Sequence, residues 1–140
     1  MAEKPVITIE DITAFALKQR RPGCEKGVLH DDAPVQTAMY RVQPGSGVPT
    51  HEHAQVYDLF IGIKGLLEIR YEGERGNGVF VLRPGAFCRV PPGVRHELSN
   101  PSKIDETLFL LVQATRSEFD YVSVPFRTME AALPFSPVTG

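Results

Sequence analysis

The chain has 140 residues, of which 42% are hydrophobic and 23% are charged, and its formal net charge is -2 at pH 7. These values are typical of one globular domain and exclude a disordered or fibrous protein. The small net charge also argues against a nucleic-acid partner, because such a partner requires a broad basic face. The two cysteines and the lack of an apolar leader or a membrane-spanning segment predict a cytoplasmic protein with no membrane contact.

The first 34 residues are expected to form an extension that packs on the main domain. Val6–Ile9 is β-branched and favours extended backbone. Asp11 is typical of a helix N-cap, so a short helix is expected over residues 11–17. Residues 29–34 are rich in polar residues and end in proline, which predicts a loop.

From Val35 onward, short β-prone runs alternate with turns that contain glycine, proline or asparagine. Residues 72–78 are expected to form a polar loop that ends in the hairpin signal Asn77-Gly78. Many short strands of this kind predict an all-β sandwich or barrel over residues 35–124, followed by a C-terminal tail over 125–140. The expected strands are 37–42, 55–63, 66–71, 79–82, 87–90, 96–98, 107–114 and 119–124, and a short helix is expected over 129–133.

Three of the four histidines are placed where they could bind one metal ion. His51 and His53 are two residues apart, so on an extended strand both imidazoles point to the same side. Asp58 follows five residues later, and His96 begins another expected strand. If those strands are neighbours, the four side chains converge. Imidazole nitrogens and a carboxylate oxygen together predict one divalent transition metal, Fe, Mn, Ni or Zn. His51 and His53 taken alone would more simply be two solvent-facing histidines.

The glycines, prolines and histidines together form two patterns, Gly45-x5-His51-x-His53-x4-Asp58-x6-Gly65 and Gly85-x5-Pro91-x-Gly93-x2-His96-x3-Asn100. In these patterns the chain resembles the cupin superfamily over about residues 35–114. The second pattern matches the family at every fixed position, and the first has Asp58 where the family has glutamate. The resemblance implies a single-domain cupin, a double-stranded β-helix or jelly-roll barrel with short N- and C-terminal extensions.

The departure at Asp58 leaves three roles open, because aspartate is one methylene shorter than glutamate. Asp58 could ligate the metal after a small backbone adjustment, and we rank this role first. It could instead hold a metal-bound water and act as a catalytic base. It could also be structural, which would leave a site of three histidines.

Substrate-pocket residues are harder to assign than the ligands. Strand alternation that turns Asp58 inward also turns Phe60 inward, which makes Phe60 a candidate pocket wall. Tyr57 and Arg41 are the other pocket candidates. An arginine among Arg41, Arg89 and Arg95 could bind a substrate carboxylate through two hydrogen bonds. Core packing for the aromatic residues and solvation for the arginines are the simpler alternatives.

The resemblance implies a small-molecule site in the mouth of the barrel, and three functions follow from it. The first is an oxygenase of dioxygenase type, with Fe(II) held by three histidines and a diketone, catechol-like ring or thiol as substrate. The second is a non-redox isomerase, cyclase or decarboxylase, in which the metal polarises a carbonyl and Asp58 moves a proton. The third is a non-catalytic module that binds a small ligand. A homodimer is a further expectation, since cupins often pair through strand edges and terminal arms.

Overall fold

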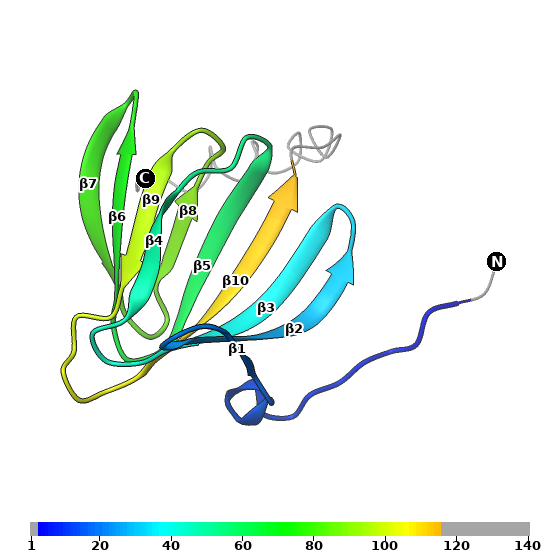
Figure 1. Cartoon of the computed structure of the whole chain (residues 1–140). Helices are drawn as coiled ribbons and strands as arrows, with labels where there is room; N and C mark the ends of the chain where they lie inside the picture. Colours follow the sequence, from blue (N-terminus) through cyan, green and yellow to red (C-terminus); the bar gives the residue numbers. More distant parts are fainter. Residues whose placement is uncertain (1–2, 116–140) are drawn as a thin grey trace, which may run out of the picture.

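The computed structural model describes residues 3–115, which form two antiparallel β-sheets that face each other (Figure 1). This arrangement confirms the expected all-β jelly roll. No helix among the described residues is long and apolar enough to cross a membrane. The strand expected over 119–124, the helix expected over 129–133 and the tail from residue 125 lie outside the described residues.

The larger sheet has six strands in the order β1-β2-β3-β10-β5-β8. Its centre is the pairing of β10 with β3 on one side and with β5 on the other, both antiparallel. Because β10 is the last described strand and lies between early ones, the sheet is assembled from segments far apart in the sequence. The strands are β1 (Lys18–Arg21), β2 (Cys24–Asp32), β3 (Val35–Val42), β5 (Val56–Lys64), β8 (Phe87–Val90) and β10 (Thr107–Thr115).

The smaller sheet has four strands in the order β4-β9-β6-β7. The hydrophobic core lies between the two sheets, and both sheets contribute to it. Each large apolar side chain buried there stabilises the fold by roughly 1.5–3 kcal/mol. The strands are β4 (Gly47–His51), β6 (Leu67–Gly73), β7 (Gly76–Leu82) and β9 (Arg95–Ser99). The buried core residues are Cys24, Val42, Phe60, Leu67, Ile69, Leu82, Val90, Leu98, Phe109 and Leu111.

The segment before Val35 contains more sheet than the sequence indicated. The loop expected over 29–34 was wrong, because β2 continues to Asp32 and its backbone pairs with β3. The helix expected over 11–17 is only a single 3-10 turn, η1 (Ile12–Ala14). Its N-cap is Asp11, whose carboxylate accepts a hydrogen bond from the Thr13 amide at 3.0 Å. Among residues 3–115, no strand pairs with Val6–Ile9.

The residues before β1 pack against the sheet at Gly27 of β2. A Cβ atom at this glycine would lie 2.5 Å from the Leu17 side chain and 2.8 Å from the Phe15 side chain. Only glycine allows such a close approach without displacing one of these side chains. Lys26 precedes Gly27 on β2. Because consecutive residues of a strand alternate, the Lys26 side chain points to the other face of the sheet.

The hairpin between β6 and β7 turns earlier than expected. Gly73 pairs with Gly76, so the turn consists of Glu74 and Arg75, and the loop expected over 72–78 was wrong. Gly78 lies inside β7 instead of in the turn. A Cβ atom there would lie 2.5 Å from the hydroxyl of Tyr71 on the paired strand, so this glycine serves side-chain packing.

Candidate metal centre

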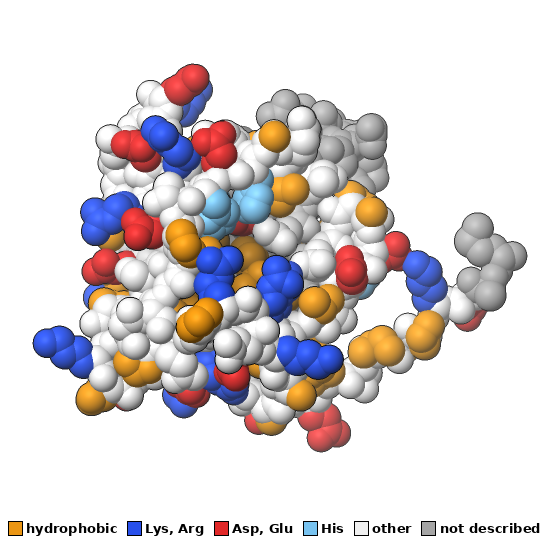
Figure 2. All heavy atoms as spheres, viewed as in Figure 1, with side chains coloured by type: hydrophobic (Ala, Val, Ile, Leu, Met, Phe, Trp, Pro, Cys, Tyr) orange, Lys and Arg blue, Asp and Glu red, His pale blue; other side chains and the backbone are white. Residues whose placement is uncertain are grey.

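Four side chains from both sheets meet at one end of the hydrophobic core. His51 ends β4, His53 lies just after it, Asp58 belongs to β5 and His96 belongs to β9. One potential ligand atom from each lies within 4.8 Å of the others. The space-filling view shows histidine side chains together at the surface, beside hydrophobic ones (Figure 2). The arrangement could therefore hold a metal ion, as the sequence pattern predicted.

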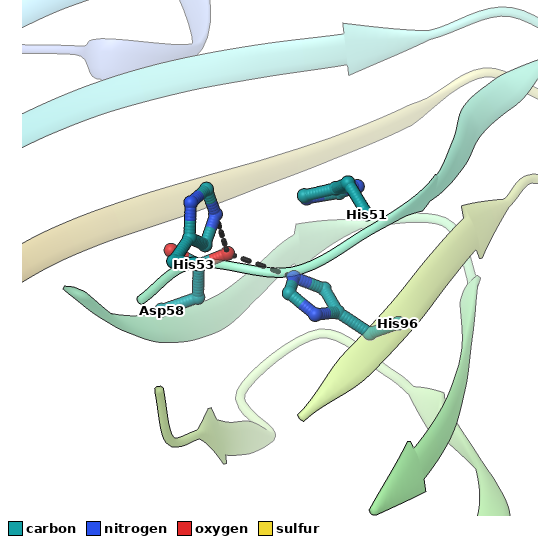
Figure 3. A group of neighbouring side chains, drawn as sticks. All are labelled: His51, His53, Asp58 and His96. Atoms are coloured by element: carbon teal, nitrogen blue, oxygen red, sulfur yellow. Dashed lines mark hydrogen bonds and ion pairs between the residues drawn. The ribbon is translucent and has the colours of Figure 1, made fainter. Parts of the chain in front are cut away.

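Strand pairing explains how the ligands are brought together. His51 and His96 are direct partners across the β4–β9 pair, and their ring centroids are 4.3 Å apart. The assumption that His51 and His53 share one strand was wrong, because β4 ends at His51. The His53 ring nevertheless lies 5.1 Å from that of His51, centroid to centroid. Asp58 completes the group from the opposite sheet (Figure 3).

Asp58 is the centre of the hydrogen-bond network. Its Oδ2 atom lies 3.1 Å from Nε2 of His53 and 2.9 Å from Nε2 of His96. Its Oδ1 atom accepts a hydrogen bond from Nε2 of Gln113 at 3.0 Å. Asp58 and His96 are each 1% exposed, so this carboxylate and its partner have almost no access to bulk water. Aspartate is thus long enough to reach the histidines despite its missing methylene.

Backbone carbonyls fix the tautomers of two of the histidines. Nδ1 of His51 lies 2.8 Å from the Pro49 carbonyl, and Nδ1 of His96 lies 3.0 Å from the Val94 carbonyl. A carbonyl oxygen only accepts hydrogen bonds, so both Nδ1 atoms carry the proton. In the neutral rings the lone pair is therefore on Nε2. Metal-binding histidines commonly have this arrangement, in which the other ring nitrogen donates to a carbonyl.

With the same tautomer, Nε2 of a neutral His96 has no proton to donate to Asp58. With Nδ1 of His96 donating to Val94, a neutral His96 directs the Nε2 lone pair at the Asp58 oxygen 2.9 Å away. Two acceptors at that distance repel each other unless a cation lies between them or the ring carries a second proton. Three imidazoles and one carboxylate are a donor set that suits divalent transition metals. The residues present therefore fit such an ion.

Burial and hydrogen bonding shift Asp58 and His51 toward the protonation states that bind metal. Burial raises the pKa of Asp58, but a hydrogen bond from His96, which requires a second proton on that ring, and one from Gln113 outweigh it, so the net pKa is below the usual value. Burial lowers the pKa of His51, although the hydrogen bond to Pro49 opposes this effect. An ionised carboxylate and a neutral imidazole are the forms that bind metal.

Phe60 lies directly behind the histidines. It is completely buried, and its ring meets that of His96 edge-on, with centroids 6.1 Å apart and an interplanar angle of 76°. It follows Asp58 by two residues on β5, so the expected alternation places both inside the barrel. Phe60 forms an apolar wall that supports the imidazole of His96.

Tyr57 points to the opposite side of β5 from Asp58, because neighbouring residues on a strand alternate. The guanidinium of Arg89 lies 5.6 Å from the centroid of its ring on that face. The structure therefore does not bring Tyr57 or Arg89 to the metal cluster.

Arg41 is also directed away from the cluster. Its guanidinium forms ion pairs with Glu25 at 2.8 Å and with Glu106 at 3.4 Å. Arg95 likewise forms an ion pair with Glu72 at 2.8 Å. These ion pairs direct Arg41 and Arg95 to carboxylates outside the four-residue cluster, and the pocket role expected for Arg41 stays a prediction.

Sequence reasoning did not assign Gln113 to the site. This residue is on β10 opposite Asp58 of β5, and its amide holds the carboxylate from the other side. The available signal is its position near the end of an otherwise apolar strand, Thr107–Thr115. A polar residue there, aligned with a candidate ligand, is typical of a supporting hydrogen bond.

Comparison with known proteins identifies the family. The profile of the family described as the cupin domain matches residues 38–112, which is more than half of the chain and includes all four clustered residues. The chain belongs to the cupin family. No curated protein matches the chain.

Several solved structures share the fold of this cupin. KdgF from Halomonas sp. superposes with a TM-score of 0.66 at 16% identity, covering 82% of this chain and 97% of its own. TT1209 from Thermus thermophilus gives 0.67 at 23% identity, covering 79% and 100%. A predicted oxalate decarboxylase from Thermotoga maritima gives 0.60 at 19% identity, covering 66% and 81%. At these identities the similarity establishes the fold alone.

Proposed function

We propose that this cupin is a metal-dependent enzyme that acts on a small organic molecule at the mouth of the barrel, with a dioxygenase-type oxidation as the first candidate reaction. The observation that carries the proposal is the complete ligand set. Three imidazoles and a carboxylate lie within 4.8 Å of one another, and two of these four side chains are buried. A bound metal ion would supply the redox or Lewis-acid chemistry that the side chains lack.

The chain's own residues would hold the ion and control its surroundings. His51, His53, Asp58 and His96 would bind it, with Nδ1 of His51 and His96 anchored on backbone carbonyls. Gln113 would keep the Asp58 carboxylate oriented through the hydrogen bond at 3.0 Å. Phe60 would exclude water from the buried side of His96. Such a shell limits which protons and solvent molecules reach the reacting centre.

A non-redox lyase or isomerase is the second candidate, and Asp58 is the residue that favours it. Its carboxylate is buried beside the imidazoles of His53 and His96 and is ionised at neutral pH, so it is available to accept a proton. Structures that share this fold include an oxalate oxidase in complex with the substrate analogue glycolate and a predicted oxalate decarboxylase. The fold thus occurs in proteins described with redox and with non-redox names.

The deciding experiment compares turnover in air and under argon. Untagged protein, freed of metal and reloaded with Fe(II), Mn(II), Ni(II) or Zn(II), would be screened against small organic acids and diketones. Oxygen consumption that requires Fe(II) is the expected result. Turnover under argon with Zn(II) or Mn(II) would contradict the oxygenase and support the second candidate.

Two controls complete this experiment. The His96→Ala variant should lose turnover together with bound metal, which ties any activity to the cluster. Ligand-induced thermal stabilisation without product, under every metal and both atmospheres, would contradict an enzyme and indicate a binding module instead.

A further inference from the structure

A second polar feature lies on the inner face of the larger sheet, beyond the four-residue cluster. Lys18 of β1 is directly opposite Lys26 of β2, and Lys26 is directly opposite Tyr40 of β3. Residues directly opposite each other in antiparallel strands share one face of the sheet. The Lys26 ammonium lies 5.5 Å from the centroid of the Tyr40 ring.

Tyr40 shows that this is the face turned toward the barrel interior. It packs against the hydrophobic core, and its ring stacks on that of Phe109 with centroids 5.1 Å apart and an interplanar angle of 2°. The Phe109 ring in turn lies 5.7 Å from that of Phe60, which supports His96. A continuous row of aromatic rings therefore connects Lys26 with the metal centre.

Within the part of the chain that the structure describes, the positive charges at this place form no ion pair with a carboxylate. We use the name cationic cluster for Lys18, Arg20 and Lys26; Arg20 lies at the irregularity of β1 opposite β2. Among residues 3–115, none of the three forms an ion pair. Like charges directly opposite on paired strands are destabilising. Glu25, which neighbours Lys26, is on the other face and pairs with Arg41.

Charges of Arg20 in the cationic cluster and of Asp58 in the four-residue cluster both affect the pKa of Tyr40. Burial raises the pKa of Tyr40 to about 12, while the charge of Arg20 lowers it and that of Asp58 raises it. Burial also lowers the pKa of Lys26, and the charge of Arg20 lowers it further, with Asp31 opposing. An anion placed beside Lys26 would relieve this repulsion.

The space-filling view shows which kinds of side chain gather near the histidines on one face (Figure 2). Lysine or arginine side chains lie close to the histidines, with hydrophobic side chains between and beside them (Figure 2). A ligand that spans this face needs an anionic end, an apolar middle and a group that reaches the metal. The net charge of -2 and the small extent of the cluster do not suit a polyanion.

We propose that the molecule bound by this cupin is a small organic anion, whose anionic group contacts Lys26 in the cationic cluster while its other end reaches the metal centre across Tyr40. The proposal rests on the proposed function for the metal end, and the cationic end can be tested separately. A lysine ammonium binds either carboxylate or phosphate as a point charge, so both chemistries belong to the test.

The experiment measures the binding of charged and uncharged probes by calorimetry. Zinc-loaded protein would be titrated with glutarate and glycerol 3-phosphate, and with their uncharged counterparts glutaramide and glycerol. We expect at least one anion to bind about tenfold or more tightly than its counterpart, as one charge-assisted contact implies. The tighter of the two anions identifies the ligand as a carboxylate or a phosphate.

Two variants locate the binding. Lys26→Met keeps most of the side-chain volume and should weaken the anion about tenfold or more without changing zinc content. Lys103→Met is the matched control at an exposed position and should change nothing. Arg20→Gln serves as the second variant if the circular dichroism of Lys26→Met shows a folding defect, and it should weaken the anion in the same direction.

The proposal would be overturned by equal affinity for charged and uncharged probes, by no binding of either anion, or by anion affinity that neither Lys26→Met nor Arg20→Gln lowers. Failure of the proposed function gives a different result, namely wild-type protein that retains no zinc. In that case the same titrations on metal-free protein still test the cationic cluster.

Discussion

The side-chain amide of Gln113 donates a hydrogen bond to Oδ1 of Asp58 over 3.0 Å, between directly paired residues of β10 and β5. The other carboxylate oxygen, Oδ2, faces His53 and His96. Oδ1 therefore binds the amide of the neighbouring strand, and Oδ2 faces the two imidazoles. This division makes Gln113 a positioning residue for the metal centre.

Replacing Gln113 by leucine removes the donor while keeping a similar side-chain volume. We expect the affinity for Zn(II) to fall about 10- to 100-fold, as is typical when an outer hydrogen bond to a ligand is lost. Competition with a chromogenic chelator measures this change. The exposed Gln19→Leu is the control. An unchanged zinc affinity in Gln113→Leu would show that the carboxylate needs no such support.

Metal content should distinguish the clustered histidines from the fourth one. His51→Ala and His96→Ala each remove a nitrogen ligand, so bound metal should fall well below that of the wild type. His30→Ala changes an exposed histidine of β2 outside the cluster and should leave the metal content unchanged. Elemental analysis of untagged protein gives the answer. Full metal content in both cluster variants would refute the metal centre.

The metal-free protein should lose stability as the pH falls. The folded-state pKa values of His51 and Asp58 are both below the usual 6.5 and 3.8, so the unfolded chain binds more protons on acidification. Stability is therefore present above each unfolded pKa and is lost as the pH falls below it, first for His51 and then for Asp58.

Urea unfolding of metal-free protein between about pH 7.5 and pH 5.5 tests the first of these steps. We expect a lower free energy of unfolding at the acidic end. His51→Ala should reduce the difference between the two pH values, and His30→Ala should retain it. Stability that rises on acidification would contradict the assigned direction of the His51 shift.

Two glycines of the sequence patterns should differ in their tolerance of alanine. Both have positive φ, +74° at Gly65 and +86° at Gly85, but only at Gly65 would a Cβ atom meet a neighbour, the Glu106 carbonyl at 2.5 Å. Gly85→Ala should cost about 1–2 kcal/mol, the backbone term alone. Gly65→Ala should cost clearly more. Urea unfolding curves of both variants measure the difference, and equal losses would mean that the contact is relieved without cost.

The sequence was sufficient to predict the ligand cluster and most central strands. The spacing of His51, His53 and His96 between turn glycines carried that information, because each turn sets where the next strand begins. The alternation of Asp58 and Phe60 correctly placed both inside. The alternation is local, whereas the convergence of His96 with His51 and His53 required that their strands be neighbours, as the resemblance to the cupin superfamily implied.

The missed features depend on neighbours that the sequence does not show. Residues 24–32 contain charged residues and a glycine, and they form β2 because β3 is available to pair with them. Arg41 looked free for a substrate until Glu25 and Glu106 were placed beside it. Gln113 gained its role only when β10 was aligned with β5. Glu106 and Asp58, the partners of Arg41 and Gln113, are distant from them in the chain.

The origin of the ligands in separate strands also sets the order of events when the protein is made. Asp58 and His96 are 38 residues apart, and Asp58 obtains its amide partner from Gln113 on β10, the last described strand. During synthesis the histidines therefore emerge well before the residue that orients their carboxylate. Loop closures of this length are slow compared with local contacts. The Asp58 carboxylate is therefore held in its final orientation only after β10 has joined the sheet.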